Sequence, residues 1–283
     1  MTQSSDFRQP APRIRELDAL NTVARRLRCR VIEMVAPTGQ GYVQQGLGAA
    51  DIFSALYFGE LRLDPADAGW EDRDRAILST AHNTAVFYAA LAERGMVEAE
   101  AIDGYCKDGS PFEINASERV GTTVEATCGS LGQGLSVGAG IALATRRRGS
   151  DSRTFVILGD GELQEGQVWE AALFAATHRI ANLTAIIDYN RMQVEGDVAK
   201  VAALEPLAEK WRSFGWSVID VDGHDIGALL EAFDRARQTA DRPTCIVANT
   251  MPGKGVPEFE GILAHNLILP ADAAARALAV LQP

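Results

Sequence analysis

The chain has 283 residues, with 27 Lys or Arg against 38 Asp or Glu, so its formal charge is −11. Hydrophobic residues make up 47% and charged residues 23%, which is the balance of a globular protein and excludes intrinsic disorder. An acidic chain lacks the basic surface that binds nucleic-acid phosphates, so we expect no nucleic-acid partner. The length allows one large domain or two small ones.

The start of the chain and the cysteines indicate a cytoplasmic protein. No apolar stretch follows a basic head at the start, so we expect no secretory signal. No apolar run approaches the roughly 20 residues that cross a bilayer, so we expect no membrane contact. The four cysteines are far apart and form no C-x-x-C pair, and we expect reduced thiols at Cys29, Cys106, Cys128 and Cys245.

The first part of the chain predicts helices around one short strand. We expect a flexible lead-in at residues 1–12, followed by a single domain over residues 13–283. Apolar residues recur at helical spacing over 13–35 and end before a proline and a glycine. Further segments predict a buried helix at 51–58, a strand at 75–79 and a helix at 84–94.

The middle of the chain alternates strands and helices. Continuous apolar runs at 154–158 and 183–187 predict strands that are buried on both faces, and 216–221 and 244–248 are two further strands. A helix is expected around 168–177, and another should follow Asp225 as its N-cap. This pattern predicts an α/β fold in which a parallel sheet carries helices on both faces. Ligands of such sheets bind beyond the carboxyl ends of the strands.

Polar residues follow two consecutive strands of this sheet. The first strand ends in Gly159-Asp160-Gly161, where glycines let the backbone approach a ligand and leave amides free for an anion. The next strand ends in Asp188-Tyr189-Asn190, and a right-handed crossover places Asp160 and Asn190 at neighbouring strand ends. A carboxylate, an amide oxygen and a nearby carbonyl suit a hard cation such as Mg²⁺, with diphosphate oxygens as further ligands.

A dinucleotide-binding fold is the alternative explanation of a Gly-x-Gly turn after a strand. In that fold, Asp160 would lie beside the diphosphate, where the two negative charges repel unless a cation separates them. The sequence therefore favours a metal–diphosphate site over a nicotinamide dehydrogenase.

These motifs resemble the thiamine diphosphate motif of transketolases. The resemblance covers most of the chain in the family's order, through segments 78–82, 129–135, 159–171, 188–194 and 254–265. It implies the thiamin diphosphate-binding fold, here its diphosphate-binding domain. It also implies thiamine diphosphate as cofactor, together with Mg²⁺ or a substitute such as Ca²⁺ or Mn²⁺.

The resemblance implies a role for each matched residue. Asp160, Asn190 and the carbonyl of Met192 would hold the metal ion. The other cofactor contacts would be Gly159 and Gly161 at the diphosphate, Gly129 and Leu131 at the aminopyrimidine ring, and Val194 near the thiazolium ring.

Three further residues complete the implied site. His82 and His265 would line the reaction centre near the diphosphate and the substrate, and Glu165 would lie at a subunit contact that links paired sites. Each has a structural alternative, such as a packing histidine at a turn or a first-turn glutamate favoured by the helix dipole. His178 and His224 match nothing in the family, and we expect them to be surface or packing residues.

The resemblance also implies that this chain carries half of an active site. In the family, the glutamate that activates the cofactor belongs to a separate pyrimidine-binding domain, whereas this chain ends at Pro283 after the first domain. We therefore expect the N-terminal subunit of a split transketolase, in an α₂β₂ assembly with a pyrimidine-domain subunit. Such an enzyme transfers a two-carbon ketol unit from a donor to an aldehyde acceptor.

Departures from the family bear on the substrate. Gln40 and Ser110 stand where the family usually has histidines that handle the sugar, and Ala81 and Asn266 replace glycines beside the matched histidines. Without these imidazoles the site lacks donors for substrate hydroxyls, so we expect an unusual or less hydroxylated α-ketol.

Two other functions stay open at this point. The chain could be the alpha-type subunit of a decarboxylating thiamine enzyme, such as a 2-oxo-acid dehydrogenase or a deoxyxylulose-phosphate synthase-like protein. It could also be a non-catalytic thiamine diphosphate-binding module.

Overall fold

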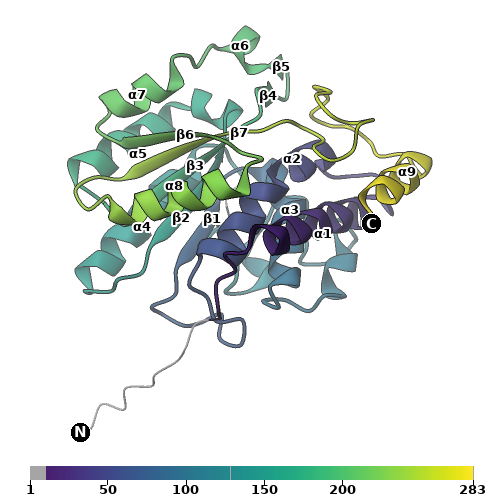
Figure 1. Cartoon of the computed structure of the whole chain (residues 1–283), viewed down its shortest axis with the longest axis horizontal. Helices are drawn as coiled ribbons and strands as arrows, with labels where there is room; N and C mark the ends of the chain where they lie inside the picture. Colours follow the sequence, from purple (N-terminus) through teal and green to yellow (C-terminus); the bar gives the residue numbers. More distant parts are fainter. Residues whose placement is uncertain (1–10, 128, 283) are drawn as a thin grey trace, which may run out of the picture.

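A five-stranded parallel sheet forms the centre of the computed structural model, which describes residues 11–127 and 129–282 (Figure 1). The strand order is β1-β2-β3-β7-β6, and every neighbouring pair is parallel. The strands are β1 (Arg75–Leu78), β2 (Thr154–Gly159), β3 (Leu183–Tyr189), β6 (Ser217–Asp222) and β7 (Thr244–Asn249). The α/β fold and all five predicted strands are therefore confirmed, with shifts of one or two residues at their ends.

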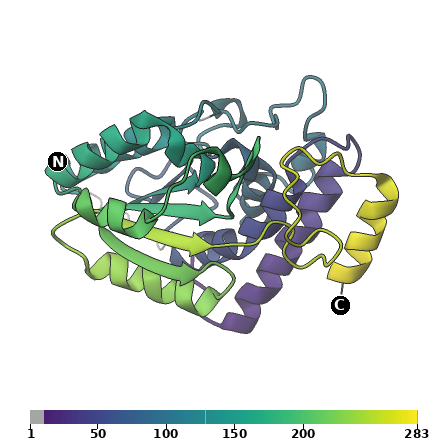
Figure 2. The same ribbon diagram turned by 90° about the horizontal axis from the view of Figure 1, so that it is seen from above.

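Helices cover both faces of this sheet (Figures 1 and 2). The first face shares one apolar core with α1 (Leu17–Val35), α2 (Val43–Ser54), α3 (Thr84–Glu93), α8 (Ile226–Gln238) and α9 (Ala271–Leu281). The second face packs against α4 (Gln133–Arg147), α5 (Gly166–Thr177) and α7 (Leu207–Ser213). Successive strand residues point to opposite faces. Because apolar helices lie on both sides, β2 and β3 have no polar alternation.

Shorter elements connect these layers. A π-helical turn, Ala55–Glu60, extends α2, and 3-10 turns occupy Ala81–Asn83, Ala101–Gly104, Glu118–Val120 and Gly161–Gln164. The strands β4 (Met192–Gln193) and β5 (Gly196–Asp197) form a small hairpin before α6 (Val198–Val201). Asp225 caps α8 as predicted, because its Oδ1 accepts from the N–H of Ala228 at 3.0 Å.

Two predicted helices have different starts in the structure. The first helix begins at Leu17 rather than at residue 13, because the preceding segment is bound to the end of the π-helical turn. There the N–H of Ile14 donates to the carbonyl of Phe58. The helix predicted at 51–58 is the last part of a longer one that begins at Val43. Every residue of α2 is buried, so no polar face marks its start in the sequence.

Some predictions fall outside the described residues. These include Cys128 and most of the lead-in predicted at 1–12. The remaining cysteines, Cys29, Cys106 and Cys245, are free thiols. In the part of the chain that the structure describes, no helix is both long and apolar enough to cross a membrane.

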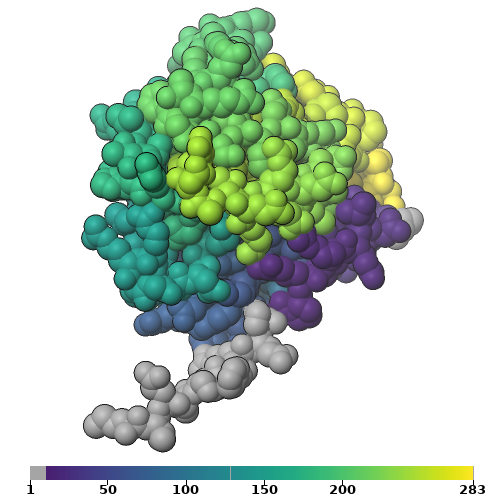
Figure 3. All heavy atoms as spheres, turned by 60° about the vertical axis from the view of Figure 1, so that its left-hand side comes forward, coloured from purple at the N-terminus to yellow at the C-terminus, as the bar shows by residue number. Residues whose placement is uncertain are grey.

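The chain after β7 returns to the first helix of the protein. It passes over α2, where the N–H of Gly253 donates to the carbonyl of Gln44 at 2.7 Å, and it leads into α9. Helix α9 then packs beside α1, and Figure 3 shows these first and last segments together at one edge of the molecule. This path carries residues 250–270 across the carboxyl edge of the sheet (Figure 2).

Two glycines of α4 allow a matched test of how closely this helix packs against β2. A Cβ atom at Gly138 would lie 2.4 Å from Cγ2 of the buried Val156 on β2, whereas one at Gly140 would meet nothing within 4 Å. We expect Gly138→Ala to lower the free energy of unfolding by about 1–3 kcal/mol, because α4 and β2 would have to separate. Gly140→Ala should leave that free energy unchanged or raise it by up to about 1 kcal/mol. Urea unfolding followed by circular dichroism measures both, and equal losses would contradict the packing.

Candidate active site

The carboxyl ends of β2 and β3 bring an acid and an amide together. Gly159 pairs with Asp188 in the parallel register, so Asp160 and Asn190 follow at adjacent strand ends. The main-chain N–H of Arg191 donates to Asp160 Oδ2, and that of Gly161 donates to Oδ1 at 2.7 Å. These two hydrogen bonds hold the carboxylate between the two strand ends.

Burial and like charge make this corner unfavourable for an isolated carboxylate. Asp160 is completely buried, and burial followed by the nearby Asp188 raises the pKa of Asp160 to about 8. Burial also raises the pKa of Asp188, although Asn83 Nδ2 and the Thr250 hydroxyl both donate to it. A cation beside the carboxylates would favour their charged forms.

The donor set at this corner fits a hard divalent cation. Asn190 is buried, its Oδ1 accepts from the N–H of Met192 at 2.9 Å, and its Nδ2 has no hydrogen-bond partner. Oxygen donors from a carboxylate, an amide and a carbonyl are those that Mg²⁺ prefers. Within the described residues, no three His, Cys, Asp or Glu side chains form a group that could hold a metal ion.

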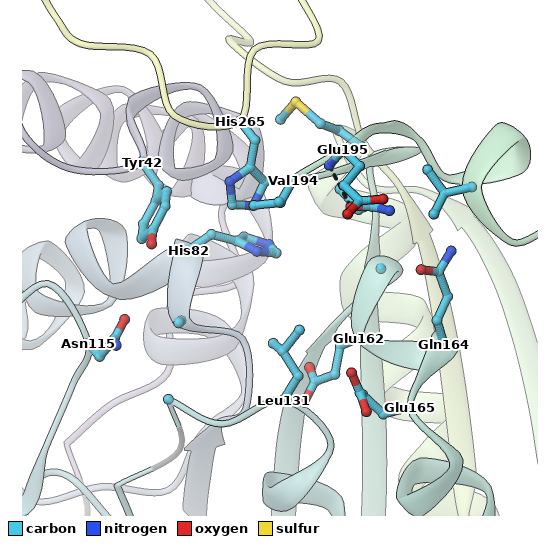
Figure 4. Close-up of a pocket in the computed structure, with 16 residues that line it drawn as sticks. Tyr42, His82, Asn115, Leu131, Glu162, Gln164, Glu165, Val194, Glu195 and His265 are labelled. Carbon is cyan, nitrogen blue, oxygen red and sulfur yellow. Dashed lines mark hydrogen bonds between the residues drawn. The ribbon is translucent and has the colours of Figure 1, made fainter.

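A cavity of about 530 Å³ opens at these strand ends (Figure 4). It is lined by most of the residues that the sequence singled out, which are His82, Gly129, Leu131, Gly161, Glu165, Met192, Val194 and His265. Gly159, Asp160 and Asn190 are buried in the strand ends next to them. The structure therefore gathers all of the predicted site residues at one edge of the sheet.

Two of the glycines allow close contact at this corner. A Cβ atom at Gly159 would lie 2.7 Å from Cε1 of His82, and one at Gly161 would lie 2.6 Å from Cβ of Gln193. Any larger residue would push these side chains away. The glycines thus keep the backbone of the turn bare and close to its surroundings, as a cradle for an anionic ligand requires.

Two histidines, His82 and His265, lie side by side in the cavity wall (Figure 4). His82 lies in the 3-10 turn after β1, whereas His265 lies in the loop between β7 and α9. Their ring centroids are 5.6 Å apart, and Tyr42 lies edge-on to His265 with a centroid distance of 5.3 Å. Burial, followed by the neighbouring His265, lowers the pKa of His82 to about 3. Its Nε2 is buried without a hydrogen-bond partner, so a neutral ring presents an unused polar atom.

Contacts from α2 and from the turn before α8 position the loop that carries His265. Gln45 Nε2 donates to the carbonyl of His265 at 3.0 Å. His224, predicted as a surface or packing residue, lies 2.8 Å through Nδ1 from Asp51 Oδ2, and its Nε2 accepts from the N–H of Met251. It is therefore a packing residue of this loop, whereas His178 is exposed.

The rim of the cavity exposes apolar and acidic side chains. Leu131 is 41% exposed and Val194 is 62% exposed. Glu165 directly precedes α5 and is exposed, but its side chain makes no capping hydrogen bond. Its position before α5 leaves the helix-dipole explanation of Glu165 open.

Several residues line the cavity without having been assigned a role from the sequence. They are Tyr42, Asn115, Glu162, Gln164, Gln193, Glu195 and Val201. Gln193 and Glu162 lie inside the recognised motifs, so their places could have been anticipated. Tyr42 and Asn115 come from segments that precede α2 and α4, where no local pattern marks them.

The two substituted histidine positions lie elsewhere. Gln40 is exposed, and its N–H donates to Thr38 Oγ1 at 3.2 Å. Ser110 Oγ accepts from the N–H of Phe112 at 3.2 Å. In the described structure, neither side chain is part of the cavity lining, so neither supplies the site with the hydrogen bonds that an imidazole would.

Comparisons with known proteins show the family of this chain. The family described as "Transketolase, thiamine diphosphate binding domain" matches residues 20–277. The chain is 39% identical over 244 residues to the 6-deoxy-6-sulfo-D-fructose transketolase subunit of a Clostridium species, covering 86% of this chain and 89% of that protein. It is 32% identical over 247 residues to an apulose-4-phosphate transketolase subunit of Phocaeicola vulgatus, covering 87% and 88%.

Solved transketolases share the fold. A transketolase from Pichia stipitis superimposes with a TM-score of 0.86 at 30% identity, over 92% of this chain and 40% of that one. The transketolase from Leishmania mexicana gives a TM-score of 0.87 at 29% identity. This chain thus spans about two fifths of the solved enzymes and most of the relatives named as subunits. The chain belongs to the transketolase family, as a member with the thiamine diphosphate-binding domain.

Proposed function

We propose that this chain is the cofactor-binding subunit of a thiamine diphosphate- and Mg²⁺-dependent transketolase. The observation that carries the proposal is the corner between β2 and β3, where the N–H after Asn190 donates to the buried Asp160. The similarity to proteins named as transketolase subunits, which have nearly the length of this chain, supports it further. The reaction would move a two-carbon ketol unit from an α-ketol donor to an aldehyde acceptor.

Asp160, Asn190 and the carbonyl of Met192 would hold the metal ion, with Ca²⁺ or Mn²⁺ as substitutes. Gly159 and Gly161 would lie against the diphosphate. The absence of a side chain at both glycines, where a Cβ atom would collide with His82 or Gln193, supports this placement. A cation held here would lie between the buried carboxylate and the diphosphate, and it would convert their repulsion into attraction.

The remaining cofactor contacts come from the cavity walls. Gly129 and Leu131 would contact the aminopyrimidine ring, and Val194 would lie near the thiazolium ring. Bound thiamine diphosphate supplies a nucleophilic carbon that carries the two-carbon unit. The exposure of Leu131 and Val194 is consistent with apolar side chains that a planar ring would cover.

His82 and His265 would orient the substrate and move protons at their ring nitrogens. A neutral imidazole has one donor and one acceptor nitrogen, so it can bind a hydroxyl and a carbonyl or phosphate oxygen in turn. The lowered pKa of His82 keeps that ring neutral across the physiological range. Tyr42 and Asn115 line the same cavity and would contribute further polar contacts to the substrate.

A pyrimidine-domain subunit would complete the active site as an α₂β₂ assembly in the cytoplasm. Its surface would cover the exposed rim formed by Leu131, Val194 and Glu165, and Glu165 would lie at the contact that links paired sites. Burying the apolar part of this rim would stabilise the assembly.

The substrate would be an unusual α-ketol rather than the standard pentose phosphates. Gln40 and Ser110 supply no imidazole to the cavity. Two similar proteins are named for 6-deoxy-6-sulfo-D-fructose and for apulose 4-phosphate, which shows how far substrates vary among such relatives. The same names favour ketol transfer over the decarboxylating and non-catalytic alternatives.

Reconstitution tests the proposed activity. We expect the purified chain to be inactive alone and to gain ketol transfer on addition of a pyrimidine-domain transketolase subunit, because the activating glutamate would come from that subunit. A coupled assay should use a panel of α-ketols, including sulfonated and branched ones. Robust ketol transfer by the single chain would refute the two-subunit arrangement. Full activity on xylulose 5-phosphate and ribose 5-phosphate would refute the substrate proposal, and carbon dioxide release from pyruvate would favour the decarboxylating alternative.

A charge swap tests the metal site. Asp160→Asn should weaken Mg²⁺-dependent binding of thiamine diphosphate to the reconstituted pair on the order of 100-fold, because it removes the anionic ligand. The double variant Asp160→Asn with Asn190→Asp restores one carboxylate at these two strand ends, so it should recover part of the lost affinity. Asp103→Asn, at an exposed position of the 3-10 turn Ala101–Gly104, is the matched control and should bind normally. Calorimetric titration in Mg²⁺ and in chelator measures each, and normal binding by Asp160→Asn would refute the site.

The buried His82 predicts a pH dependence of stability. Its folded pKa of about 3 lies below its ordinary value of 6.5. Between these two pH values, the ring is protonated in the unfolded chain and neutral in the folded chain. Stability from this group is complete above pH 6.5 and is lost as the pH falls towards 3. When the pH is lowered from about 7 to about 5.5, the free energy of unfolding should fall in both proteins. The fall should be about 1 kcal/mol smaller for His82→Gln than for the wild type, because the variant lacks this group. Urea titrations at both pH values measure this, and an equal loss would contradict a neutral, buried ring.

A further inference from the structure

Glu162 is a buried acid to which the proposed function assigns no role. It lies in the 3-10 turn Gly161–Gln164 and is only 2% exposed. Donors from three different segments converge on its carboxylate. The Ser79 hydroxyl at the end of β1 donates to Oε1, the N–H of Gly132 donates to Oε1 at 2.8 Å, and the N–H of Gly159 donates to Oε2 at 3.1 Å.

The carboxylate supplies a cap that helix α4 lacks. The N-cap residue is Gly132, which adopts a left-handed conformation with φ of 84° and has no side chain to cap the helix. Glu162 instead accepts its N–H, and Ser79 Oγ accepts the N–H of Gly134 at 3.1 Å. A negative charge at a helix N-terminus is also favoured by the helix dipole. The first turn of α4 is therefore held by residues from β1 and from the turn after β2.

The contact between these segments is close. A Cβ atom at Gly134 would lie 2.4 Å from Cβ of Ser79, so only a glycine fits where α4 meets the end of β1. A Cβ atom at Gly132 would lie 3.1 Å from Cβ of Glu165. The segment 129–134 thus has little freedom to shift while Glu162 keeps its three partners.

We propose that Glu162 is a positioning residue that fixes the spacing between the two halves of the cofactor site. One oxygen holds the segment 129–134, which includes the residues assigned to the aminopyrimidine ring, and the other holds Gly159 at the diphosphate. This inference rests on the proposed function, since it takes those assignments from it. Both halves then belong to one rigid unit before the cofactor binds, which reduces the ordering cost of binding.

The geometry requires an acceptor at both oxygens. A glutamine at position 162 could still accept from Ser79 and Gly132 through its carbonyl oxygen. Its amide nitrogen would face the N–H of Gly159, so two donors would meet and one buried N–H would lose its partner. An alanine would leave all three donors without the carboxylate. The two substitutions therefore remove one and then all of the contacts.

Kinetics of the reconstituted pair test the positioning role. We expect Glu162→Gln to raise the apparent KM for thiamine diphosphate about tenfold, and Glu162→Ala to raise it further, because the unpaired donors are buried. At saturating cofactor, kcat of Glu162→Gln should fall much less than KM rises. The matched control is Glu60→Gln, which alters another buried glutamate that lies 2.7 Å from Arg237 and away from the cavity. It should lower the melting temperature without changing this KM.

Amide hydrogen exchange of the full chain without cofactor provides a second readout. Both Glu162 variants should exchange faster over residues 129–134 than the wild type, whereas Glu60→Gln should match the wild type there. Unchanged exchange would overturn the inference, and so would faster exchange with an unchanged KM. If the wild-type pair does not bind thiamine diphosphate, the proposed function is wrong, and the positioning role is wrong with it. Hydrogen exchange could still show the three hydrogen bonds of Glu162 in that case.

Discussion

The parallel pairing of β2 with β3 is the constraint on which the rest of this site depends. Parallel strands end at the same edge of a sheet, and the register of Gly159 with Asp188 puts the two following turns side by side. The N–H of Arg191 then reaches Asp160 across the gap between them. If the register slipped by one residue, the carboxylate would face away from its partner, so packing of the apolar strands on both faces indirectly maintains the site.

Burial sets the charge state of the side chains at the ends of β2 and β3. Asp160, Asp188 and Glu162 lie at the strand ends with little contact with water, and His82 is held neutral beside them. Such groups are costly in an apolar interior unless donors or a cation accompany them. Main-chain N–H groups provide part of this compensation. The unpartnered nitrogens of His82 and Asn190 mark where a ligand would provide more. The site is therefore organised around polar groups that a bound anion and cation would satisfy.

Local patterns predicted much of this architecture. The buried strands, the Asp225 cap and the two polar turns were each recognisable from a few neighbouring residues, because strand burial and turn chemistry are encoded locally. The start of α2 was missed because a helix buried all round lacks the polar face that defines a period. Tyr42 and Asn115 were missed as wall residues because their place depends on contacts between segments distant in sequence.

The sequence alone determined the fold class, the order of the strands along the chain and the candidate residues for a metal and a diphosphate, since these follow from apolar runs and from residue chemistry. Tertiary structure alone decided that His265 comes to lie beside His82, and that Glu162 joins the ends of β1 and β2 to the start of α4. The physical reason is that such contacts arise when separate elements pack together. Their distances depend on the whole core, whereas a sequence motif records only its own neighbours.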